Sequence, residues 1–249
     1  MKKALIASIL LISVVVIVLV IRLRGGGMAH IDGIAIVEVT TSTGIIKLQT
    51  ELDTPDLFGN KIDTDDLIAL VSKRNRKMKG KPEVSYRHER TRREYKVMLA
   101  AWLLGKVKEP KGFPHLLELA EDPFFVMRGC AVCALQSFGD RRALPTLIRI
   151  LREKKPCNGF LVPAIGALGD NSAVTPLIET IPISGAKEAE EILKAIEEIT
   201  GLSLVEVRKE WGLVYYREKH AAFLTFMRSW WQKNEAKSRN GRAAGGGTL

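Results

Sequence analysis

The chain has 249 residues, a formal net charge of +10 and only four histidines. Its length, less an apolar N-terminal segment, suits one medium-sized domain plus a small one. The sequence has no P-loop, GxGxxG phrase, Ser–His–Asp order or zinc-ligand spacing, which argues against the commonest catalytic classes. Three cysteines cannot form a fully paired set of intrachain disulfides.

The N-terminus begins with Lys2 and Lys3 and continues as an apolar run over residues 4–21, in which fourteen of eighteen residues are Leu, Ile or Val. As a helix this run is about 27 Å long, close to the thickness of one hydrocarbon core. It has no polar face, so lipid is the best solvent for its surface. The sequence therefore predicts a transmembrane anchor over residues 1–24, with a cleaved signal peptide as the alternative.

The side of the membrane on which the body lies stays undecided. The charges on the two sides of the apolar run slightly favour a cytoplasmic N-terminus and export of the body, the part of the chain that follows this run. The strongly basic body favours the opposite orientation, but it lies far from the segment. We therefore expect a single-pass membrane protein and leave its orientation in the membrane undecided.

Residues 25–72 differ in character from the rest. Residues 34–39 and 45–52 are rich in Ile, Val and Thr, and alternation of apolar and polar residues predicts a β-hairpin. Residues 60–63 could add a short strand, and Asp63 could cap a helix through residues 67–71. Because an isolated hairpin is only marginally stable, this segment should dock on the remaining chain or recruit a further strand.

A basic segment covers residues 73–96, which contain eleven Lys or Arg and three Glu. We interpret it as a connector and the start of a helix. Its charge could also neutralise anionic lipid headgroups, an anionic protein or, less favoured, nucleic acid. The candidate contacts with such a partner are Lys73, Arg74, Arg76, Lys77, Lys79, Lys81, Arg87, Arg90, Arg92 and Arg93.

A recurring phrase of the form Ala–apolar–x–x–apolar–Gly marks the next region. It reads AAWLLG at residues 100–105, ALQSFG at 134–139 and AIGALG at 164–169, and a degraded copy, AIEEIT, covers 195–200. The leading alanines are 34, 30 and 31 residues apart. Periods of this size indicate a stacked repeat protein.

Each repeat can be read as two helices. The small alanine allows a neighbouring helix to approach, and the glycine ends the helix in a left-handed conformation. A polar turn follows, and then a proline in the first turn of the next helix, as at Pro114, Pro145 and Pro176. We expect helix ends near Gly105, Gly139, Gly169 and Thr200, and three to four stacked pairs.

Residues 134–148 and 164–178, which contain the phrase, the turn and the proline, resemble the HEAT-repeat superfamily. They are especially similar to the short bacterial HEAT-like units first named from phycobilisome lyases. The resemblance covers roughly residues 90–235 and implies an all-α, right-handed α-solenoid. Members of the superfamily include scaffolds, lyases, nucleic-acid binders and an iron hydroxylase class, so the resemblance favours protein binding by analogy only.

Two candidate chemical sites are weak. Cys130 and Cys133 have redox or metal-ligand spacing but lie inside a predicted helix, so we expect them to pack as small apolar residues. His88–Glu89 resembles one of the His–Glu pairs of the iron hydroxylases, and one pair cannot assemble a di-iron site. We therefore expect no metal, no cofactor and no catalytic residue.

Aromatic and apolar residues recur at three- and four-residue steps near the C-terminus. The sequence predicts a capping helix over residues 220–233 with Trp230 or Trp231 buried, because terminal repeats need a cap. The alternative is an exposed aromatic docking site. Residues 236–249 are expected to form a disordered tail.

These patterns predict an all-α HEAT-like array over residues 92–235, preceded by a transmembrane helix and a small β-containing segment. The predicted function is a membrane-tethered, non-catalytic scaffold for a protein partner. Binding of anionic lipid or nucleic acid through residues 73–96 is the alternative, and a lyase-type enzyme is a third.

Overall fold

A computed structural model describes residues 35–50, 58, 61–82, 92–153, 159–169, 171–182, 186–211 and 219–245. Most of these residues are helical, as expected for an all-α repeat protein. The chain divides into two compact units, one of Met1–Thr40 with Gly44–Ile62 and the other of Thr41–Thr43 with Asp63–Leu249. None of the helices in the described ranges is long and apolar enough to cross a membrane, and the predicted anchor of residues 1–24 lies outside these ranges.

The first unit carries a three-stranded sheet in the order β2-β1-β3. Its strands are β1 (Ala35–Thr41), β2 (Gly44–Thr50) and β3 (Lys61–Asp63). The predicted hairpin is confirmed, and the short strand predicted at residues 60–63 joins it as β3. The sheet thus recruits the third strand that a marginally stable hairpin needs.

The helical unit begins with α3 (Thr64–Met78). Asp63 is the N-cap residue, and its carboxylate accepts a 2.8 Å hydrogen bond from the backbone N–H of Asp65. Leu67 and Val71 are fully buried and lie on the side of α3 that packs against α4 (Arg92–Val107) and α5 (Phe113–Leu119). The apolar stripe of α3 makes it the first helix of the stack. The helix continues across residues 72 and 73, where the sequence predicts that a β-containing segment (25–72) meets a basic connector and first helix start (73–96).

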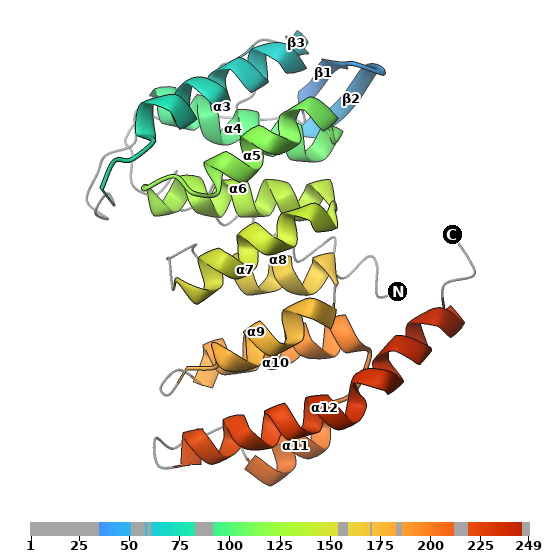
Figure 1. Cartoon of the computed structure of the whole chain (residues 1–249). Helices are drawn as coiled ribbons and strands as arrows, with labels where there is room; N and C mark the ends of the chain where they lie inside the picture. Colours follow the sequence, from blue (N-terminus) through green and yellow to red (C-terminus); the bar gives the residue numbers. More distant parts are fainter. Residues whose placement is uncertain are drawn as a thin grey trace. The chain divides into compact units, whose positions relative to one another are not determined.

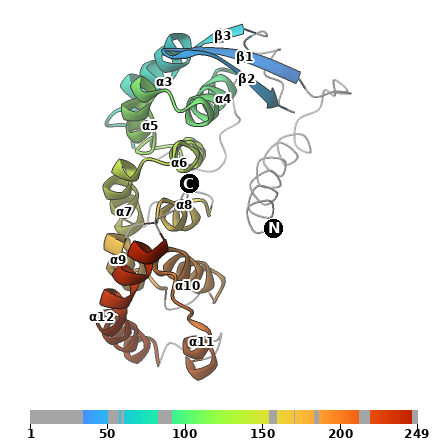
Figure 2. The same ribbon diagram turned by 90° about the vertical axis from the view of Figure 1, so that its right-hand side faces the viewer.

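The helix α3 and the helices that follow it as far as residue 200 form two rows, which Figure 1 and Figure 2 show from two sides. We name as the first-helix row α3, α5 (Phe113–Leu119), α7 (Leu144–Arg152) and α9 (Val174–Glu179). The second-helix row contains α4 (Arg92–Val107), α6 (Phe125–Phe138), α8 (Leu161–Leu168) and α10 (Ala186–Thr200), which pack on one another in this order. Short 3₁₀ turns, η1 (Pro110–Gly112), η2 (Arg141–Ala143) and η3 (Asn171–Ala173), precede α5, α7 and α9.

Glycine ends the second-row helices at three of the four predicted places. Gly139 and Gly169 are left-handed, and their N–H groups bond back to the carbonyls of Leu135 and Ile165. Gly201 does the same one position after the degraded phrase, with φ of 70° and a 2.8 Å bond to the Glu197 carbonyl. Only glycine adopts this conformation without strain, so the phrase does mark helix ends.

Gly105 is an exception to the expected helix ends. The helix α4 continues to Val107, and Lys108 adopts the positive φ of 55° beyond it. Gly105 serves close packing instead, because a Cβ atom there would lie 2.5 Å from the carbonyl oxygen of Ala134 and 2.7 Å from its Cα. Ala134 is itself buried, so α4 and α6 approach closely through two small residues.

Replacement of Gly105 by alanine is expected to destabilise the protein. In an ordinary helix the change from Gly to Ala stabilises by about 0.4–1 kcal/mol. Here the new methyl group meets the backbone of α6, and the overpacking should cost about 1–3 kcal/mol net. Urea unfolding followed by circular dichroism measures the difference.

The matched control is Gly166→Ala on α8. Its new Cβ would meet the carboxylate oxygen of Glu198, the far end of a flexible side chain, at 2.7 Å, whereas the nearest backbone atom, the Cα of Ala195, lies at 3.3 Å and the Cβ of Ala195 at 3.2 Å. Because a side chain moves more easily than a backbone, this variant should lose less stability. Equal or greater stability of Gly105→Ala than of the unmodified protein contradicts the close-packing interpretation.

Two helices close the array, α11 (Val205–Trp211) and α12 (His220–Gly245). Arg208 of α11 pairs with Glu190 and Glu197 of α10, and α12 packs on α9 and α10. Phe223, Met227 and Trp231 of α12 are buried. The predicted capping helix with Trp231 buried is confirmed.

The helix α12 is longer than predicted. Residues 236–249 were expected to be disordered, but α12 continues to Gly245. Ser238 is buried, and its hydroxyl lies 3.2 Å from both the Thr200 carbonyl and the Asn171 amide oxygen. These contacts with η3 and the end of α10 explain why the helix persists beyond the predicted cap.

Candidate interaction surface

The predicted basic surface gathers at one end of the α3–α4 pair. Arg74, near the end of α3, pairs with Glu94, near the start of α4, so these two helix ends lie together. Among the ten predicted contact residues, seven are exposed, and Arg87 and Arg90 lie outside the described residues. The exposed residues are Lys73, Arg76, Lys77, Lys79, Lys81, Arg92 and Arg93.

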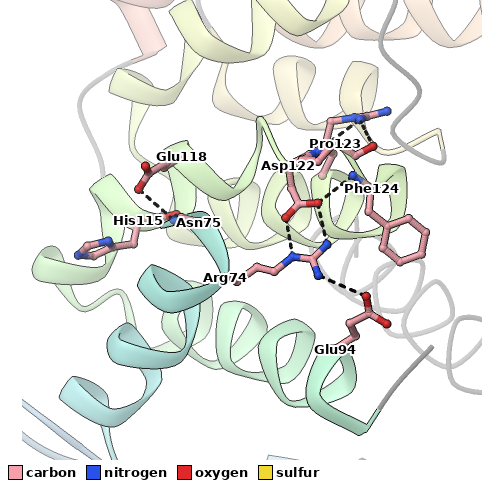
Figure 3. Close-up of polar contacts among 9 residues, drawn as sticks. Arg74, Asn75, Glu94, His115, Glu118, Asp122, Pro123 and Phe124 are labelled. Carbon is pink, nitrogen blue, oxygen red and sulfur yellow. Dashed lines mark hydrogen bonds and ion pairs between the residues drawn. The ribbon is translucent and has the colours of Figure 1, made fainter. Parts of the chain in front are cut away.

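Arg74 does not belong to this surface, which corrects the prediction from sequence. Its guanidinium is about nine-tenths buried and donates to both carboxylate oxygens of Asp122, at 2.7 and 3.0 Å, and to Glu94 at 3.3 Å (Figure 3). Burial alone lowers the pKa of Arg74, but the hydrogen bonds and negative charge of Asp122, with those of Glu94, raise that pKa overall. This side chain is structural and cannot contact an external anion.

Asp122 is the centre of a larger polar network in the turn between α5 and α6. It also accepts a 2.8 Å hydrogen bond from the Phe124 N–H. Arg128 of α6 is buried and donates to the carbonyls of Asp122 and Pro123, at 2.9 and 3.1 Å. Figure 3 shows that the network joins the end of α3, the start of α4 and the turn before α6.

Asn75 makes a second polar link, which joins α3 to its row neighbour α5. Its amide group donates to the His115 carbonyl at 3.0 Å and to the Glu118 carboxylate at 3.1 Å (Figure 3). Together with Arg74, it fixes α3 against its neighbours. Of the exposed basic residues, Lys73, Arg76 and Lys77 lie on this helix, Lys79 and Lys81 follow its C-terminal end, and Arg92 and Arg93 begin α4.

The sequence analysis did not identify Glu94, Asp122 and Arg128 as a network. Two signals were available: Arg128 is the sole charged residue in the apolar α6, and Asp122–Pro123 directly precedes that helix. A buried arginine needs acceptors, and the carbonyls of the preceding turn are the nearest ones.

The two cysteines of α6 are half-buried rather than fully packed. Cys130 and Cys133 are reduced cysteines on one side of the helix. No cluster of three or more His, Cys, Asp or Glu within the described ranges could hold a metal ion. His88, Glu89 and Cys157 lie outside those ranges.

The helix pairs with their left-handed glycine caps agree with a comparison against protein families. Residues 91–156, which contain α4 to α7, match the family described as HEAT repeats. This match supports a HEAT-repeat protein. The search of curated proteins returned no match.

Proposed function

We propose that this HEAT-repeat chain is a membrane-tethered scaffold that binds a protein partner along one face of its helix stack and performs no catalysis. The observation that carries the proposal is the array itself, two rows of short helices in which α4 to α7 match the family described as HEAT repeats. Arrays of this kind present long continuous faces made of equivalent positions from successive repeats. Such faces suit the binding of an elongated protein surface.

The tether is proposed from the sequence of residues 4–21. Its uninterrupted apolar character favours insertion into lipid, and the two lysines before it can remain in the aqueous phase. A tether confines the scaffold to the membrane surface, so the partner is expected at or near the same membrane.

A second candidate function is binding of an anionic surface by the exposed basic residues of α3 and α4. The favouring observation is that seven exposed bases lie in or directly after the last turns of α3 and in the first turn of α4, two helix ends that the Arg74–Glu94 pair brings together. At about 1 kcal/mol for each base near an anionic membrane, this surface could add to the tether if the body is cytoplasmic.

One experiment addresses both the tether and the partner. Membranes containing the full chain are washed with alkaline carbonate, solubilised in mild detergent and subjected to crosslinking and affinity capture. We expect the full-length chain to remain in the carbonate pellet and to capture a defined protein in stoichiometric amount. A triple variant of Lys73, Arg76 and Lys77 to Ala is the matched control, and it should capture the same amount.

Release of the full-length chain by carbonate contradicts the tether. Binding that falls steeply with salt and is lost in the triple variant favours the basic surface, because contacts with lipid or nucleic-acid phosphates weaken as ionic strength rises. Absence of any captured protein from the unmodified chain contradicts the scaffold function.

A further inference from the structure

The second-helix row has a side that no described helix covers. Both α6 and α8 contact a neighbour on each side within the row and also contact their first-row partner, which leaves one side outward. The residues on that side recur at helical spacing. We call them the uncharged face: Tyr95 and Trp102 of α4, Cys130 and Cys133 of α6, and Pro163 and Ala167 of α8, all half-buried or exposed.

This face carries no charge over two successive helices. The one charged residue of α6 is Arg128, which is buried, and the sequence of α8 contains no charged residue. The first-helix row differs, since α7 bears exposed Arg149 and Arg152 in ion pairs. A scarcity of charged residues, combined with the presence of Trp and Tyr, is typical of the buried centre of a protein interface.

Long charged side chains border the uncharged face on both flanks. On α4, Lys106 is exposed, and its ammonium group lies 5.7 Å from the centre of the Trp102 ring. On α10, Lys187, Glu191, Lys194 and Glu198 alternate in sign at the spacing of one helix side. The short residues of α6 and α8 thus lie between a basic flank and a mixed flank.

We propose that the uncharged face binds an amphipathic helix of the protein partner, with its apolar stripe on α6 and α8 and acidic residues beside Lys106. The inference rests on the proposed scaffold function and names the chemistry of its partner. Two arguments carry it. A helix about 10 Å wide fits over neighbouring helices that are 8–10 Å apart, and acidic residues complement the charge of the α4 flank.

The test uses the detergent-solubilised full chain and two synthetic helical peptides of equal length. Both peptides carry a leucine stripe, flanked in one by glutamates and in the other by lysines. Fluorescence anisotropy should show at least about tenfold tighter binding of the Leu–Glu peptide. Lys106→Glu should remove most of this preference.

Variants of the face itself identify the site. Ala167→Glu and Trp102→Ala should each weaken binding of the Leu–Glu peptide by at least about tenfold, since a buried charge or a lost aromatic anchor is costly at an interface centre. Thr175→Glu introduces the same charge at an exposed position of α9 in the other row, and should leave binding unchanged. Circular dichroism confirms that each variant is folded.

The outcomes separate this inference from the scaffold function. If the unmodified chain captures its protein partner and Ala167→Glu captures an equal amount, the inference is overturned and the scaffold function stands. Equal affinity for both peptides overturns the proposal that the partner helix places acidic residues beside Lys106. If the chain sediments as a dimer that Ala167→Glu dissociates, the occupant is a second copy and the proposal is wrong.

Discussion

Deletion of residues 220–249 is expected to lower the melting temperature by at least about 10 °C. The deletion removes α12 and with it the buried side chains of Phe223, Met227 and Trp231. At about 1.5–3 kcal/mol each, their burial contributes about 5–9 kcal/mol as an upper estimate. This is comparable to the whole unfolding free energy of a typical domain, because the last pair of an array cannot cover its own apolar stripe.

Point variants on α12 provide the matched comparison. Met227→Ala should lower the free energy of unfolding by about 2–5 kcal/mol, since Met227 is fully buried. The neighbouring Arg228 is exposed, and Arg228→Ala should change it by less than about 0.5 kcal/mol. If both the deletion and Met227→Ala leave the melting temperature unchanged, α12 is not a structural cap and an aromatic docking role becomes the better interpretation.

Asp122→Ala is expected to lower the free energy of unfolding by about 3–5 kcal/mol. The variant leaves the Arg74 guanidinium, which is about nine-tenths buried, with Glu94 as its one remaining ionic partner among the described residues. It also removes the acceptor for the Phe124 N–H at the start of α6. Unfolding by urea, followed by circular dichroism and by tryptophan fluorescence, measures the loss.

Glu121→Ala is the control for this prediction. Glu121 directly precedes Asp122 and also accepts two hydrogen bonds from an arginine, Arg149, whose side chain is half exposed. Exposed ion pairs contribute at most about 1 kcal/mol, so this variant should be nearly as stable as the unmodified chain. Similar losses in the two variants would show that burial does not govern the strength of the Asp122 network.

Local features were predictable because they depend on a few neighbouring residues. The hairpin strands follow from alternation of side chains, the start of α3 follows from the capping carboxylate of Asp63, and the ends of α6 and α8 follow from Gly139 and Gly169. The repeat period likewise predicted the stacking of helix pairs. In each case the conformational preference of a residue agrees with its tertiary environment.

Other features depended on residues far apart in the chain. Arg74 was indistinguishable in sequence from the other bases of residues 73–96, and its partner Asp122 lies 48 residues away. Gly105 occupies the same place in the repeated phrase as the caps Gly139 and Gly169, yet its role is set by the approach of Ala134 from α6.

The sequence by itself therefore determined the helical repeats, the helix start at Asp63 and the burial of a C-terminal cap. Only the tertiary structure decided which base is removed from the basic surface, how far α12 extends and which side of α6 and α8 faces outward. The reason is physical: a helix cap or a strand is stabilised within a few residues, whereas burial of a charge or exposure of a helix side depends on the helices packed around it.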